Sequence, residues 1–179
     1  MNTSRVIWIT GLSGAGKSTL AKVLVEKLRL SGKSVVMLDG DELREVLGAA
    51  KTSSNSYGRE VRLDLAMQYS HLCRIIASQG LIVVIATISL FREVHFWNRA
   101  NLLGYFEIYL KVPLEELRRR DSKQIYRRFD AGELKNVAGL DLAIDEPEAA
   151  DWIVEFQSDR LVTELADDLL IRLNVRRAL

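Results

Sequence analysis

The stretch Gly11-Leu-Ser-Gly-Ala-Gly16-Lys17-Ser18-Thr19 decides the fold of this chain of 179 residues. It follows a short apolar run, Val6 to Thr10, and precedes Ser18 to Leu30, where apolar residues recur at helical spacing. Glycines let the backbone curve closely around an anion, and a helix that begins there directs its positive end at the same point. A strand, such a loop and a helix in this order predict a site for a nucleoside triphosphate.

Strand-like and helix-like segments alternate along the rest of the chain. We expect further strands at 34–38, 81–87, 105–110 and 152–156, and helices at 41–47, 59–78, 92–102, 113–120 and 161–176. This alternation predicts an α/β fold of the P-loop NTPase type, with three α/β/α layers around a parallel sheet. We expect one domain over 1–179 and place the second strand beside the first. Residues 121–145 are charged and weakly patterned.

Composition excludes several kinds of partner. The formal net charge is +1, so no overall field attracts nucleic acid or an anionic membrane. The longest apolar run, Leu81 to Leu90, is too short to span a bilayer. The one cysteine, Cys73, lies in a helical pattern and is expected to be a buried apolar residue. We therefore expect a cytoplasmic chain whose basic groups act only locally.

The loop specifies how MgATP would be held. The Lys17 ammonium reaches the β- and γ-phosphates, and the Ser18 hydroxyl joins the Mg²⁺ shell. The residues expected to bind ATP are Gly11, Ser13, Gly14, Ala15, Gly16, Lys17, Ser18 and Thr19.

Three classes of protein use such a loop, and two fit poorly. A Ras-like GTPase should carry an Asn-Lys-x-Asp motif, which this sequence lacks. A motor ATPase should end its third strand in an acidic residue, but here the strand runs into Thr87 and Ser89. A small-molecule kinase fits best. Asp39 and Asp41, which follow the second strand, could then hold Mg²⁺ and accept a proton from the attacking hydroxyl; the plainer alternative is an Asp-Gly turn before an acidic helix start.

Five stretches in order resemble the adenylylsulfate kinases, over about Val6 to Trp152. They are Gly11-Leu-Ser-Gly-Ala-Gly-Lys-Ser-Thr19, Leu38-Asp-Gly-Asp-Glu-Leu-Arg44, Ile88-Ser89 with Phe91-Arg92, Lys123-Gln-Ile-Tyr126, and Ala131-Gly-Glu-Leu-Lys135 with Gly139-Leu-Asp141. The resemblance implies a kinase with a mobile lid, here about 121–145, that phosphorylates the 3′-hydroxyl of adenosine 5′-phosphosulfate with MgATP.

The resemblance also implies roles for single residues. Lys17, Asp39, Asp41 and Ser89 would be catalytic, with Ser18 and Asp39 on the metal. The acceptor nucleotide would meet Asp41, Arg44, Tyr57, Arg62, Ile88, Ser89 and Lys123, and Arg127 and Arg128 would belong to the lid. A lid suits phosphoryl transfer because closure excludes water that would hydrolyse ATP. Family members often pair, so a homodimer is a further expectation.

The departures from the family pattern gather on the acceptor side. The replacements are Val61 for an aspartate, Leu65 for an asparagine, Gln68 for an arginine, Leu90 for a proline, and Val137 for the aromatic that stacks on adenine. Losing a stacking aromatic costs on the order of 1–3 kcal/mol per base. Tyr57, Phe91, Phe96 and Trp97 are candidates to compensate, although Phe96 and Trp97 are expected in the core.

Three interpretations remain open. The leading one is the family's own reaction, sulfate activation from adenosine 5′-phosphosulfate. The alternative is the same chemistry on another small-molecule 5′-nucleotide conjugate, such as cytidine diphosphoramidate, which the altered base pocket favours. The third is a nucleotide-binding protein without catalysis, which the retained Lys17, Asp39 and Arg44 oppose. His71 and His95 have no partners at metal-ligand spacing and receive no role.

Overall fold

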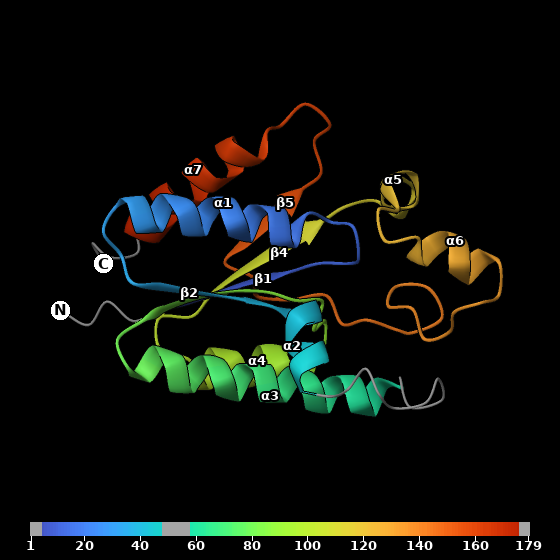
Figure 1. Cartoon of the computed structure of the whole chain (residues 1–179), viewed down its shortest axis with the longest axis horizontal. Coiled ribbons are helices and arrows are strands. Elements are labelled where there is room, and N and C mark those ends of the chain that lie inside the picture. Colours follow the sequence, from blue (N-terminus) through green and yellow to red (C-terminus); the bar gives the residue numbers. More distant parts are fainter. Residues whose placement is uncertain (1–4, 48–57, 176–179) are drawn as a thin grey trace.

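The computed structural model describes residues 5–47 and 58–175, and contains a five-stranded parallel sheet (Figure 1). The strands are β1 (Arg5–Thr10), β2 (Val35–Asp39), β3 (Ile82–Ala86), β4 (Phe106–Lys111) and β5 (Trp152–Glu155). The helices are α1 (Lys17–Leu30), α2 (Gly40–Val46), α3 (Arg59–Ser78), α4 (Arg92–Asn101), α5 (Leu114–Arg120), α6 (Ile125–Asp130) and α7 (Val162–Val175). The predicted three-layer α/β/α fold is confirmed.

Helices cover both faces of the sheet, as Figure 1 shows. Helices α1 and α7 pack on one face, and α3 and α4 pack on the other. Alternate residues of β1 supply the two cores: Ile7 and Ile9 join the cluster with α1 and α7, while Val6 and Trp8 join the cluster with α3 and α4. A strand buried on both faces needs apolar residues at every position, which explains the continuous apolar runs of β1 and β3.

The expected neighbour of the first strand was wrong. The strand order is β2-β3-β1-β4-β5, so β3 lies between β1 and β2. Every residue of β3 is buried, whereas four of the five residues of β2 are only partly buried. The more apolar strand therefore takes the inner position and β2 forms the edge. The registers Ile9–Ala86 and Asp39–Ala86 end the three strands level with one another.

The segment 121–145 contains a helix that its weak pattern did not indicate. Helix α6 begins after Asp121, whose carboxylate accepts hydrogen bonds from the backbone N–H groups of Tyr126 (3.1 Å) and Arg127 (3.0 Å). Its buried side chain is Tyr126. One apolar contact and one capping side chain stabilise this short helix, too little to produce a visible period.

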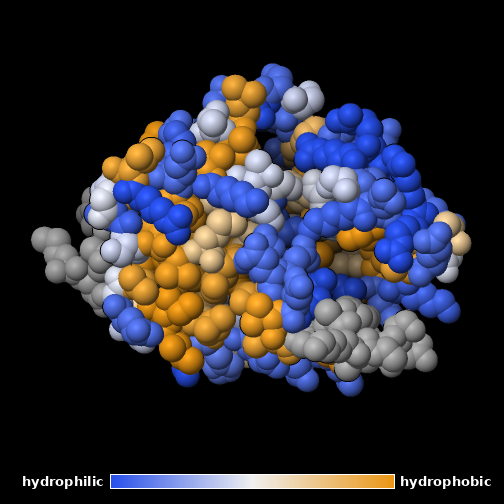
Figure 2. Space-filling model, in the orientation of Figure 1, coloured by the Kyte–Doolittle hydropathy of each residue, from blue (hydrophilic) through white to orange (hydrophobic). Residues whose placement is uncertain are grey.

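Surface character differs between the two sides of the molecule. Figure 2 shows apolar side chains gathered near the β2 edge and hydrophilic ones around α5 and α6. Within residues 5–47 and 58–175, the structure contains no helix with the length and apolarity that crossing a bilayer requires.

Gly40 lies where the end of β2 meets the chain beyond β3. A Cβ atom at this position would lie 2.8 Å from Thr87 Oγ1 and 3.0 Å from Thr87 Cβ. Contacts this short do not occur between relaxed atoms, so the backbone between Asp39 and Asp41 approaches Thr87 as closely as it does only because residue 40 is a glycine.

We predict that Gly40→Ala destabilises the chain by about 1–3 kcal/mol, because overpacking forces the β2 end away from Thr87. Urea denaturation of the two proteins measures the difference. The matched control is Gly58→Ala, since Gly58 has an ordinary φ of −60° and open space around its Cβ position. Equal stability of the Gly40 variant and the wild type would contradict the close packing.

Candidate active site

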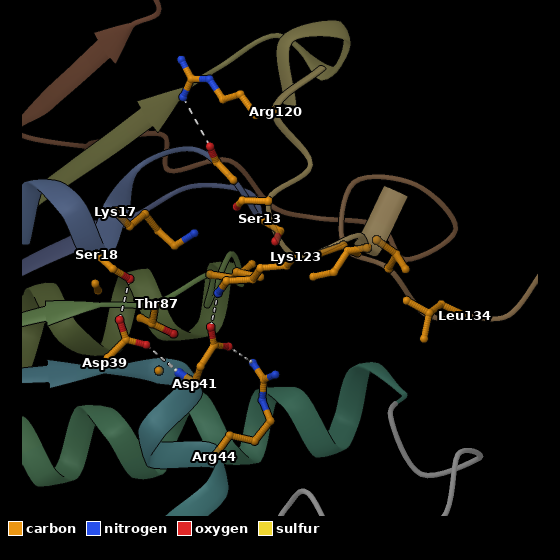
Figure 3. A pocket seen from close by; sticks show the side chains of 18 of the residues that line it. Ser13, Lys17, Ser18, Asp39, Asp41, Arg44, Thr87, Arg120, Lys123 and Leu134 are labelled. Atoms are coloured by element: carbon orange, nitrogen blue, oxygen red, sulfur yellow. Dashed lines mark hydrogen bonds and ion pairs between the residues drawn. The ribbon is translucent and has the colours of Figure 1, made fainter. Parts of the chain in front are cut away.

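A cleft of about 1040 Å³ opens at the carboxyl ends of β1, β2 and β3, and residues of the α5–α6 segment complete its wall (Figure 3). Its wall includes Ser13, Gly14, Gly16, Lys17, Ser18, Thr19, Asp39, Gly40, Asp41, Arg44, Arg62, Thr87, Ile88, Arg120, Lys123, Arg128, Val137 and Ala138. Residues from opposite ends of the chain therefore face one cavity, at the edge of the sheet where parallel strands direct their ligands.

The glycine-rich loop forms the floor of the cleft between β1 and α1. Six of the eight residues expected to bind ATP line the cavity. The other two, Gly11 and Ala15, do not: a Cβ on Gly11 would lie 2.7 Å from the Leu110 carbonyl oxygen, and Ala15 packs in the core. The absence of a side chain at Gly11 allows the loop to pack closely against β4.

Lys17, the first residue of α1, is held close to its own loop. Its Nζ donates to the Leu12 carbonyl oxygen at 2.7 Å. Burial and the nearby charge of Lys123 lower the pKa of Lys17 to about 8, although the charges of Asp41 and Asp39 act in the opposite direction. A buried ammonium without an anion is poorly solvated, so this site would be stabilised by a phosphate group.

Asp39 joins the end of β2 to the loop, although β3 lies between the two strands. Its Oδ2 accepts a hydrogen bond from the Ser18 hydroxyl at 2.5 Å, and its Oδ1 accepts from the Asp41 backbone N–H at 2.9 Å. Among the described residues, no group of three or more metal-binding side chains occurs. One carboxylate beside a hydroxyl fits Mg²⁺, which takes one or two protein oxygens and completes its shell with phosphates and water.

Asp41 lies on the cavity side of the same turn and contacts two cations. Lys123 bonds its Oδ2, and Arg44 lies 3.4 Å from its Oδ1 (Figure 3). Burial alone would raise the pKa of Asp41, but the hydrogen bond from Lys123 and the charges of Lys123, Arg44 and Lys17 lower it below its usual value. The carboxylate is therefore ionised where it lines the cleft.

A small recess adjoins the cleft on the α3 side; we call it the acceptor recess. It is lined by Arg44, Arg62, Leu65, Tyr69, Thr87, Ile88, Ser89, Leu90, Phe91, Ala138, Leu142, Ala143 and Ile144. Arg44, Arg62 and Ile88 line the cleft as well, whereas Ser89 lines only the recess. Tyr57, also expected to bind the acceptor, lies outside the described residues.

Three of the replaced positions lie on the walls of these cavities. Leu65 and Leu90 line the recess, and Val137, which is 8% exposed, lines the cleft. Val61 and Gln68 instead lie on the exposed face of α3. Arg62 Nη2 donates to the Asn136 carbonyl oxygen at 2.7 Å, and the Asp141 carboxylate accepts from the backbone N–H groups of Asn136 and Val137 at 2.8 and 2.6 Å. These bonds hold Val137 at the cavity wall.

The aromatic candidates divide between two environments. Phe91 is buried and lines the recess. Phe96 is 64% exposed, so its expected place in the core was wrong, and neither Phe96 nor Trp97 lines the cleft or the recess. Among the described candidates, Phe91 is therefore the one that lines either cavity.

Three cleft residues were not singled out from the sequence as parts of the site. Arg120 ends α5, donates to the Gly14 carbonyl oxygen at 3.3 Å and lines the cleft. Arg119 does not line the cleft, although both arginines pair with Glu116. Thr87 forms a hydrogen bond between its hydroxyl and that of Ser89 at 2.8 Å, beneath Gly40. Val137 was identified from the sequence only as a departure from the family pattern, and it lines the cleft. Of the two lid arginines expected from the sequence, Arg128 lines the cleft and Arg127 does not.

Comparison with protein families matches residues 3–155 to the model described as adenylylsulphate kinase. A Campylobacter jejuni protein named cytidine diphosphoramidate kinase is 41% identical over 148 residues, which are 83% of this chain and 84% of that protein. An Aeromonas hydrophila adenylyl-sulfate kinase is 37% identical over 174 residues, covering 96% of this chain and 85% of the relative.

A solved structure agrees with these similarities. The Mycobacterium tuberculosis APS kinase in complex with AMPPNP and APS superposes with a TM-score of 0.83 at 30% identity, covering 97% of this chain and 99% of that one.

We predict that the binding of a nucleoside triphosphate takes up a proton above pH 8. In the empty site the lowered pKa leaves Lys17 mostly neutral at pH 9, and the anionic phosphates favour its charged form, so binding raises the pKa and draws about one proton from solution. Titration calorimetry in buffers of different ionisation enthalpy measures this uptake.

The control is the same titration at pH 6.5, where Lys17 is already protonated and uptake through it should vanish. Affinity should fall as the pH rises above 8. An affinity and a proton count that stay constant from pH 7 to pH 9.5 would contradict this account of Lys17.

Proposed function

We propose that this chain, which belongs to the adenylylsulphate kinase family, transfers the γ-phosphate of ATP to the 3′-hydroxyl of a cytidine 5′-diphosphate conjugate, with cytidine diphosphoramidate as the acceptor. The broader activity is that of an ATP-dependent phosphotransferase acting on a 5′-nucleotide conjugate. The proposal concerns which nucleotide the acceptor side selects, and which residues carry the reaction.

The observation that carries this choice is the aliphatic wall at Val137. A purine placed against valine lacks the stacking face that an aromatic side chain supplies, a loss of about 1–3 kcal/mol. A pyrimidine has a smaller ring and depends less on such a face. The recess beyond it, about 40 Å³, adds Leu65 and leaves little depth for a second ring. The 41% identity to the cytidine diphosphoramidate kinase points in the same direction.

Adenosine 5′-phosphosulfate is the second candidate, and it was the leading expectation from the sequence. It is supported by Arg44 and Arg62 in the cleft wall, which would bind an anionic 5′ group on either acceptor. The similarity to the Aeromonas hydrophila adenylyl-sulfate kinase and to the APS-bound structure also supports it. Neither observation distinguishes the two bases, because both concern the phosphates or the fold.

On the phosphate side, the proposed reaction relies on charge and position. Lys17 and the loop N–H groups hold the β- and γ-phosphates, and Ser18 and Asp39 would hold Mg²⁺. The metal supplies charge neutralisation at the phosphate oxygens. Ser89 and Arg128 would contact the transferring group or its neighbours from the recess and the lid segment, so that the γ-phosphate faces the acceptor hydroxyl in line.

On the acceptor side, we assign proton acceptance to Asp41. Both carboxylates line the cleft, but Asp39 is bonded to Ser18 and so belongs to the metal side, whereas Asp41 contacts Lys123 and Arg44. In the empty site Lys123 and Arg44 hold Asp41 ionised, which also makes it a weak base. When phosphates bind, Lys123 has a competing anion, and its transfer to the phosphates would restore the basicity of Asp41 as the acceptor hydroxyl arrives.

Two buried tyrosines support the two sides separately. The Tyr69 hydroxyl donates to the Gly40 carbonyl oxygen at 3.0 Å, between the two carboxylates. The Tyr126 hydroxyl donates to the Ser13 carbonyl oxygen at 2.9 Å, on the phosphate loop. Burial raises the pKa of both phenols to about 12, so both remain donors throughout the working range of pH.

The homodimer expected from the sequence stays a prediction.

We predict that Tyr69→Phe and Tyr126→Phe separate these roles. Losing the bond to Gly40 should lower kcat about fivefold with an unchanged KM for ATP, because the carboxylates lose their alignment. Losing the bond to Ser13 should raise the KM for ATP by a similar factor. Steady-state kinetics on both variants measures the split. Identical effects of the two substitutions would contradict a site built from two separately supported sides.

The experiment that tests the function compares acceptors. Initial rates of ADP release with MgATP should give a kcat/KM for cytidine diphosphoramidate about tenfold or more above that for adenosine 5′-phosphosulfate. Lys17→Ala should abolish both rates and exclude background hydrolysis. A higher kcat/KM with adenosine 5′-phosphosulfate would establish the second candidate instead, and slow rates with both would refute each acceptor.

A reciprocal variant strengthens the comparison. Val137→Phe should shift the ratio toward the adenosine compound, because it restores a stacking face. Val46→Phe is the matched control, since Val46 is 81% exposed on α2 and does not line the cleft. An unchanged ratio in the Val137 variant would remove the base-wall argument.

A further inference from the structure

The wall of the acceptor recess includes a stretch without helix or strand, Leu142 to Ile144. At its first residue, the Leu142 backbone N–H donates to the Val137 carbonyl oxygen at 3.2 Å and its carbonyl oxygen accepts from the Gly139 N–H at 2.9 Å. Ala143 and Ile144 lie between Leu142 and Asp145, so their position depends on the anchors on either side. The Asp141 carboxylate supports the first anchor through its bonds to Asn136 and Val137.

Asp145 supplies the second anchor, and each of its polar groups is engaged. Its backbone N–H donates to the Leu90 carbonyl oxygen at 3.0 Å, and its carboxylate accepts from Arg59 and from the Arg92 backbone N–H, both at 3.1 Å. Its carbonyl oxygen lies 3.2 Å from Nε2 of His95. The two carboxylate bonds lie near the surface, whereas the bonds to the buried Leu90 and to His95 lead into the protein.

The other nitrogen of the same ring meets a buried carboxylate. His95 Nδ1 lies 2.7 Å from Glu107 Oε1, in the middle layer of the fold on β4. The side chain of Glu107 is 2% exposed and that of His95 is 11% exposed. Glu107 also accepts from the Tyr105 hydroxyl at 2.9 Å and lies 3.5 Å from Arg99.

This arrangement makes the ring a bridge with an acceptor at each end. A carbonyl oxygen can only accept, and Glu107 already accepts from Tyr105, so His95 joins two acceptors and both of its nitrogens are engaged. A buried carboxylate is costly unless it is well bonded, and removing one partner leaves it uncompensated. The sheet therefore holds His95 firmly, and His95 holds the Asp145 carbonyl.

We propose that His95 is a positioning residue for acceptor binding. Its ring connects Glu107 on β4 to the Asp145 carbonyl oxygen, and this connection fixes the recess wall from Leu142 to Ile144. His95 does not contact the acceptor itself. The inference rests on the proposed function, because it assigns the recess to the acceptor nucleotide. His95 itself lines neither the cleft nor the recess.

Two amide variants separate the ends of the bridge. His95→Asn keeps a donor at the position of Nδ1, near Glu107, and loses contact with Asp145; His95→Gln extends its amide to the position of Nε2. The Asn variant should raise the acceptor KM about fivefold and leave the KM for ATP unchanged, since one hydrogen bond is lost. The Gln variant keeps the contact with Asp145 but loses the one with Glu107, so it should recover part of this loss.

Backbone amide exchange tests the bridge without any acceptor. In the full chain, the Asp145 N–H should exchange about fivefold faster in His95→Asn than in the wild type, and His95→Gln should lie between them. His71→Asn is the matched control: His71 is the other histidine of the chain, stacks on Trp97 with ring centroids 4.5 Å apart, and lines neither cavity. It should change neither quantity.

The outcomes are distinguishable. Faster Asp145 exchange with an unchanged acceptor KM would overturn the positioning role, and so would an equal rise in both KM values, which a general loss of stability produces. Unchanged exchange in His95→Asn would overturn the bridge itself. If the wild type phosphorylates neither nucleotide, the proposed function has failed, and so has the role of His95 in acceptor binding. The amide exchange rate of Asp145 still decides whether His95 holds Asp145.

Discussion

The parallel register that ends β1, β3 and β2 level with one another is the constraint on which the rest of the cleft depends. Because Asp39 and Ile9 both lie beside Ala86, the carboxylate after β2 and the loop after β1 emerge at the same height. The Ser18–Asp39 hydrogen bond can then reach across β3. A shift of one residue would turn each side chain to the opposite face of the sheet and separate these groups.

Charge in the cleft is concentrated although the chain as a whole is nearly neutral. Lys17, Lys123 and Arg44 face Asp39 and Asp41, so the cations are already gathered and held in place before any phosphate arrives. Phosphoryl transfer needs little covalent chemistry from a protein and much fixed charge. In the empty cleft the carboxylates hold these cations in place, so a positive electrostatic field is already present for the phosphates. When phosphates compete for the cations, Asp41 is released to act as a base.

The two sides of the cleft differ in how they are built. The phosphate side is built mainly from one continuous stretch, residues 11–19, whose glycines shape the loop and whose Lys17 and Ser18 line the cleft. The acceptor side is assembled from α2, α3, the chain after β3 and residues 136–145. Its walls are side chains, such as Val137 and Leu65, so its selectivity can change through single substitutions while the phosphate side stays the same.

The sequence by itself determined the α/β class, the phosphate loop and its flanking elements, and the pair of carboxylates after the second strand, because each is encoded within about ten residues by local backbone preferences and periodicity. It did not reveal the strand order, helix α6, the inward place of Arg120 or the buried bridge at His95. These depend on which surfaces pack together: β3 became central because it is apolar on both faces, and His95 gained partners 12 and 50 residues away in the chain. Only tertiary packing brings such residues within hydrogen-bonding distance, so no local sequence pattern could have indicated these contacts.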